Sequence, residues 1–157
     1  MDTTLIGVVI GGLIGVASTL VAQILARRHR RSDLLREAAA SFIRTTHAKF
    51  YADQRVHLAV FSLMDARRDA DISESVLSER ERAERDATKE YNSYVDSAHN
   101  TLAEIELLEP RLKVAGYKLI EASQIPANSE RGTYSRDQQA SLATARANFI
   151  KCVRRYI

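Results

Sequence analysis

The sequence has few residues that interrupt a helix. It contains two prolines and no tryptophan, and of its six glycines only Gly116 and Gly132 lie beyond residue 15. Good helix formers, namely alanine, arginine, glutamate and leucine, are abundant. No stretch sustains the alternation of polar and apolar residues that is typical of a strand. These features together predict an all-α fold.

Cysteine is almost absent as well. The single Cys152 excludes an internal disulfide and fits a reducing compartment. Because it lies in a helical pattern among apolar neighbours, we expect a buried, unreactive thiol.

Charge is missing from residues 4–26, which form a run of 23 uncharged residues. A helix of this length is roughly 34 Å long, enough to cross a hydrocarbon core of about 30 Å. A cleaved signal peptide would need Lys or Arg ahead of a shorter apolar run of about 7–15 residues. Here only Asp2 precedes the run. The sequence therefore predicts an uncleaved transmembrane helix.

A cluster of arginines follows this segment: Arg27, Arg28, Arg30 and Arg31. Positive residues beside a span stay in the cytoplasm, so we expect the N-terminus outside and residues 32–157 at the cytoplasmic face of the inner membrane. The arginines also suit anionic lipid headgroups, at about 1 kcal/mol each, although an ordinary stop-transfer role explains them too. The predicted domains are an anchor, residues 1–31, and a helical domain, residues 32–157.

The helical domain has no excess of either charge. Without the four arginines and Asp2, 19 basic and 19 acidic residues remain. The basic balance of the whole chain is therefore a property of the anchor. A neutral domain lacks the electrostatic footprint of a nucleic-acid-binding protein.

Small residues recur every three or four positions along the predicted transmembrane helix. This stripe consists of Gly7, Gly11, Gly15, Ser18, Thr19 and Ala22. Small side chains allow two helix backbones to approach closely in a membrane. The stripe predicts a homo-oligomer or a membrane-protein partner, although glycine is also common in membrane helices in general.

Apolar residues at helical spacing predict two long helices in the domain. The first covers residues 32–68 and can continue directly from the transmembrane helix. After a turn at residues 69–73, the second runs from Ser73 or Ser78 to Glu109. Antiparallel pairing about residue 70 would bring Phe50 beside Tyr91.

Two shorter helices should follow. Pro110 suits the first turn of a helix over residues 110–124. Residues 125–134 read as a loop, after which Ser135 and Gln138 have the spacing of a capping box. Four helices with short connections predict an antiparallel up-and-down bundle.

The chain resembles a group of uncharacterised single-pass membrane-anchored proteins of high-GC Gram-positive bacteria and their phages. The resemblance rests on the arginine cluster, on residues 34–42 (LLREAAASF), on residues 105–110 (IELLEP) and on residues 145–150 (ARANFI). It implies the anchored helical architecture and no particular activity.

Chemistry-bearing residues form no recognisable catalytic motif. A di-metal bundle would need Glu on two helices and Glu-x-x-His on two more. The nearest approaches are Asp53 with His57 and Asp96 with His99, and the hairpin register places these pairs too far apart to share an ion. No nucleophile elbow or phosphate-binding glycine loop is present. We therefore predict no metal, no cofactor, no small-molecule substrate and no enzymatic activity.

These features indicate a membrane-anchored module that acts by protein contact, for example a scaffold, a regulatory subunit or a phage-type immunity factor. One alternative is a holin-like protein that permeabilises membranes, which the large patterned domain disfavours. The other is a helical-bundle enzyme whose site the sequence does not reveal.

Overall fold

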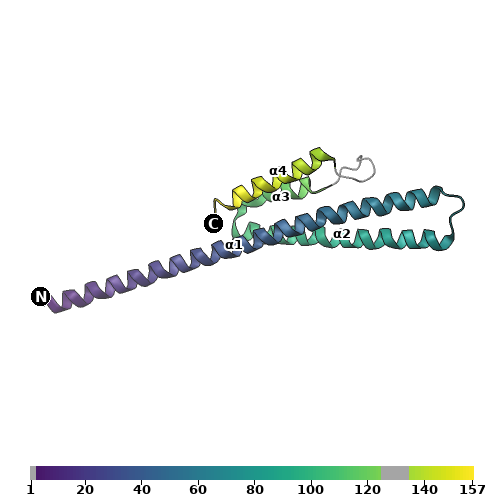
Figure 1. The fold of residues 1–157 in the computed structure, drawn as a ribbon. Coiled ribbons are helices and arrows are strands. Elements are labelled where there is room, and N and C mark those ends of the chain that lie inside the picture. Colours follow the sequence, from purple (N-terminus) through teal and green to yellow (C-terminus); the bar gives the residue numbers. More distant parts are fainter. Residues whose placement is uncertain (1–2, 125–134) are drawn as a thin grey trace. The chain divides into compact units, whose positions relative to one another are not determined.

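A computed structural model describes the backbone of residues 3–124 and 135–157, with side chains from residue 18 onward in those ranges. Its elements are α1 (Thr3–Arg68), α2 (Glu74–Leu108), the 3-10 helix η1 (Pro110–Leu112), α3 (Lys113–Ala122) and α4 (Arg136–Val153) (Figure 1). The described residues contain helices and no strand, so the all-α prediction is confirmed. The chain forms two compact units, Met1–Leu34 and Leu35–Ile157, which are described separately.

The first unit is helical from Thr3 onward, as the first part of α1. Its side chains are exposed over residues 18–31. Within the described part of the chain, no helix combines the length and the apolar character needed to cross a membrane. Residues 4–17 of the predicted span lie outside the residues whose side chains are described. The transmembrane helix therefore stays a prediction.

In the second unit, α1 and α2 form the expected antiparallel hairpin. α1 ends at Arg68, as predicted, and α2 begins at Glu74. Beginning this helix at Ser78 would be wrong, because the extended backbone of Ser73 (φ −74°, ψ 148°) already marks the helix start. The ammonium group of Lys49 lies 5.4 Å from the centre of the Tyr91 ring, which agrees with the predicted register.

The next two helices also follow the local signals in the sequence. Glu109 is extended (φ −150°), and Pro110 then starts η1, so α3 is separate from α2. α3 ends at Ala122, two residues earlier than expected. The capping box of α4 is confirmed, since the Ser135 hydroxyl accepts from the Gln138 N–H at 3.2 Å and the Gln138 side chain accepts from the Ser135 N–H at 2.8 Å. The predicted loop, residues 125–134, lies outside the described residues.

The larger apolar cluster of the described residues joins α1, α2, α3 and α4. It includes the contact between Phe42 of α1 and Phe149 of α4, whose ring centroids are 5.1 Å apart. The remaining buried members are Leu35, Ala38, Ala39, Ala98, Leu102, Ile105, Leu112, Leu119, Ile120 and Val153. Val56 and Val60 of α1, farther along the hairpin, are only half-buried.

Gly116 marks the closest approach of α3 to α2. A Cβ atom added at this glycine would overlap Cδ1 of Leu102, a side chain that is itself buried in the core. The two helices can therefore pack at this distance only because residue 116 has no side chain.

We expect Gly116→Ala to lower the free energy of unfolding by about 1 kcal/mol. Overpacking a core lowers the free energy of unfolding by about 1–3 kcal/mol. The better helix propensity of alanine offsets about 1 kcal/mol of this loss. Urea unfolding of the full chain measures the difference. Val114→Ala, at an exposed position of the same helix, should change stability by less than about 0.5 kcal/mol. A more stable Gly116→Ala protein would contradict the close approach.

Candidate functional site

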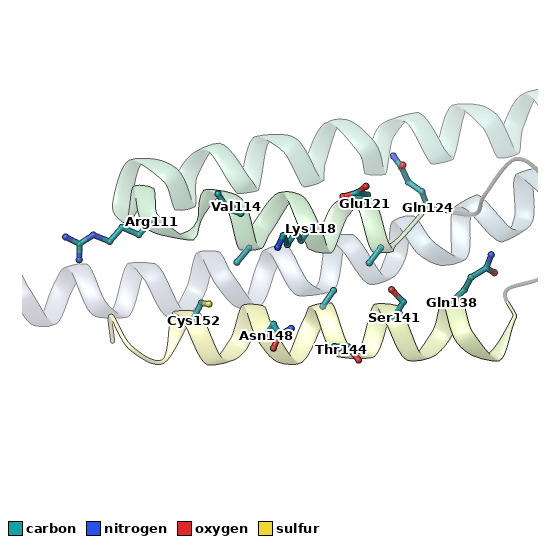
Figure 2. A pocket seen from close by; sticks show the side chains of 13 residues that line it. Arg111, Val114, Lys118, Glu121, Gln124, Gln138, Ser141, Thr144, Asn148 and Cys152 are labelled. Atoms are coloured by element: carbon teal, nitrogen blue, oxygen red, sulfur yellow. The ribbon is translucent and has the colours of Figure 1, made fainter.

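A groove of about 890 Å³ runs between α3 and α4. Figure 2 shows its two walls: Arg111, Val114, Lys118, Glu121 and Gln124 line one side, and Gln138, Ser141, Thr144, Asn148 and Cys152 line the other. We call this feature the α3–α4 groove.

Small side chains line the groove on both helices. Ala115 and Ala122 come from α3 and Ala145 comes from α4, so these positions add little side-chain volume to the space between the helices. The charged lining residues are Arg111 of η1 and Lys118 and Glu121 of α3, whereas the α4 wall is polar and uncharged. A lining that mixes apolar surface with hydrogen-bonding groups suits a protein segment, which needs apolar burial and a few partners for its polar groups.

Cys152 lies at one end of this groove (Figure 2). The sequence predicts a buried thiol, but the side chain is only half-buried.

A second polar feature lies inside the bundle. Lys49 of α1 is fully buried, with 0% of its surface exposed. Its ammonium group donates to the Ser123 carbonyl at 3.3 Å and to the Ser123 hydroxyl at 3.2 Å. Ser123 is the C-cap of α3, where backbone carbonyls have no partner within the helix. Lys49 therefore caps α3 from a different helix, in the position where the helix dipole favours a cation.

Two further groups complete the surroundings of Lys49. Burial lowers the pKa of the Lys49 ammonium group below 10.5, and the negative charge of Asp53, one turn along α1, partly opposes this shift. Burial also raises the pKa of Tyr91 above 10.0, and Asp53 adds to that shift. A lysine of lowered pKa is a feature of some catalytic sites. Here the ammonium group is fully buried and hydrogen-bonded to a helix end, and we interpret it as a structural tie.

The sequence analysis does not predict this buried lysine, although a signal is present. Lys49 follows Thr46 by three residues and precedes Asp53 by four, so all three lie on the inward face of α1. A search for apolar residues at helical spacing finds Phe50 on that face but does not detect the charged residues Lys49 and Asp53 beside it. The i, i+4 pairing of opposite charges on an inward face is the signal that could identify the site.

The predicted anchor residues fall in the first unit. Gly7, Gly11 and Gly15 lie in the part of α1 without described side chains. Ser18, Thr19 and Ala22 are exposed. The lipid-facing candidates Arg27, Arg28, Arg30 and Arg31 are exposed too, so both roles stay predictions.

The acidic and histidine pairs considered from the sequence have separate surroundings. Nε2 of His57 lies 3.8 Å from Oδ1 of Asp53. The ring of His99 lies 6.2 Å from the ring of Tyr117 on α3, measured between centroids. Among the residues that the structure describes, no three His, Cys, Asp or Glu side chains are grouped so that they could hold a metal ion.

Comparison with known proteins gives no relative: no family model, no curated protein and no solved structure matches this chain.

The role of Lys49 can be tested by two substitutions. We expect Lys49→Ala to lower the free energy of unfolding by about 2–4 kcal/mol, because it leaves a cavity and removes both hydrogen bonds from the ammonium group to Ser123. Lys49→Met fills the same space without a buried charge and should change stability by less than about 1.5 kcal/mol. Urea unfolding at neutral pH compares the three proteins.

The same variants predict a pH dependence. Because the pKa of Lys49 is lower in the folded than in the unfolded state, the unfolded chain binds more protons above the folded pKa. Stability relative to Lys49→Met should therefore rise with pH, measured from about pH 7 to 9.5 so that Tyr91 stays protonated. A difference that falls as pH rises would contradict the burial of a charged ammonium group.

Proposed function

We propose that this protein is a single-pass membrane-anchored helical module that acts by protein contact. Residues 4–26 would span the inner membrane, with the N-terminus outside and residues 32–157 at the cytoplasmic face. Support for the anchor comes from the uncharged run and the arginines that follow it. Lipid headgroups would contact Arg27, Arg28, Arg30 and Arg31.

The observation that carries the contact function is the α3–α4 groove. It is open to solvent along one face of the bundle, and its lining combines alanines and Val114 with hydrogen-bonding groups and three charged side chains. Such a surface can bury the apolar side of a protein segment while its polar side remains hydrated. A scaffold or regulatory role follows from this surface, and a phage-type immunity factor is one specific form of it.

Photocrosslinking in native membranes tests the proposal. A photoreactive side chain at Ser141, inside the groove, should give a discrete adduct with another protein. The same group at Ala147, which is exposed on another face of α4, serves as the control and should give none. Equal labelling from both positions, or none from either, would contradict a contact function for this groove.

A further inference from the structure

The far half of the α1–α2 hairpin consists of two helices instead of four. α4 begins at Arg136, and the crevice that it shares with α1 extends only to Gln54. From there to the turn, α1 and α2 continue as a pair (Figure 1). Ion pairs tie them together, Arg55 to Glu90 at 2.7 Å and Arg67 to Glu81 at 3.0 Å.

A hollow of about 490 Å³ with a mixed lining lies on this two-helix segment. Its larger apolar lining residues are Leu58, Phe61, Ile72 and Val76, and its polar ones are Ser62, Asp65, Asp69 and Arg80. Leu58 is 54% exposed and Val76 is 37% exposed, whereas the apolar side chains of two amphipathic helices that pack together are usually buried. We call this feature the distal groove.

The two sides of the distal groove carry opposite charges. Asp65 lies on the α1 wall with Asp69 just beyond the end of that helix, and Arg80 lies on the α2 wall. Asp65 is also 4.0 Å from Arg68 of its own helix, on an exposed surface where such a pair contributes little. The register set by the Arg55–Glu90 and Arg67–Glu81 pairs places Asp65 and Arg80 within about one helical turn of the same level along the hairpin. The groove thus has an acidic wall and a basic wall at one height.

We infer that the distal groove binds the distal groove of a second copy of this chain. Two hairpins related by a two-fold axis parallel to their helices place α1 of one copy opposite α2 of the other. Asp65 then faces Arg80 of the second copy, and Arg80 faces its Asp65, so each acidic wall meets a basic wall. The apolar side chains between them form the core of an intermolecular four-helix bundle.

This arrangement rests on the proposed membrane anchor, which would hold both copies at one face of the same membrane. A two-fold axis perpendicular to the helices would instead set α1 opposite α1 of the second copy, so that acidic wall meets acidic wall and the match of charges is lost. The contact is small, but anchoring in one membrane raises the effective concentration of the second copy. A modest contact therefore suffices for a dimer.

Disulfide crosslinking between two tagged forms of the full chain tests the pairing. Both forms carry Cys152→Ser and are reconstituted together in lipid vesicles. One form carries Asp65→Cys and the other Arg80→Cys, so a disulfide between the two tags forms only across copies. The control replaces Arg80→Cys by Arg82→Cys, which lies two residues along on another face of α2 and is likewise exposed. We expect at least tenfold more crosslink from the first pair.

Charge exchange supplies an independent readout. Asp65→Arg or Arg80→Asp alone should reduce dimer formation at least tenfold, and the two together in one chain should restore it, because like charges repel and exchanged charges attract. Leu58→Asp should also abolish the dimer while leaving the fold intact, since this side chain is exposed in a single copy. Arg82→Asp serves as the control and should have no effect.

Equal crosslinking from both cysteine pairs, or a double charge variant that fails to dimerise, would overturn the inference. Vesicle flotation of the same samples separates this failure from failure of the proposed function. Chains that float with the vesicles without crosslinking would refute the distal contact alone, whereas chains that do not float would refute the anchor.

Discussion

The contact between Phe42 and Phe149 is the interaction on which the bundle depends. Both rings are fully buried, and they join the first long helix to the last helix of the chain. Burial of two such rings contributes several kilocalories per mole, of the order of 2–3 for each side chain. Because α4 must return along α1 to make this contact, α3 is held between α4 and α2. The groove between α3 and α4 is a consequence of that arrangement.

Lys49 adds a polar constraint to this apolar one. Burial of the charged ammonium group carries a desolvation penalty. The hydrogen bond that this group donates to the Ser123 carbonyl, at the C-terminal end of α3, offsets part of that penalty. The tie connects positions 49 and 123, so it fixes where α3 stops against α1. Apolar packing alone allows one helix to slide along another. The hydrogen bonds of Lys49 would be broken by such sliding, so they hold the C-terminal end of α3 at one position along α1.

Helix ends that depend on neighbouring residues are predicted well from the sequence, whereas features that depend on packing between helices are not. The end of α1 at Arg68, the start of η1 at Pro110 and the capping box at Ser135 depend on neighbouring residues, so the sequence contains the information. The start of α2 is ambiguous between two serines because both are followed by helix-forming residues. Lys49 and the α3–α4 groove are different, since they depend on how side chains from separate helices fill space. A charged residue on an inward face and the alanines that line a groove become meaningful only when the opposite helix is in place.

The α3–α4 groove and the distal groove are both open surfaces of the second unit. They belong to different helices, so one copy can present the first to another protein while the second pairs with a like chain. Both proposals require the domain to lie on one defined side of a membrane. Protease treatment of sealed cells measures this most directly. Our account predicts that an external protease leaves residues 32–157 intact until the cells are permeabilised, and digestion of this domain in sealed cells would contradict it.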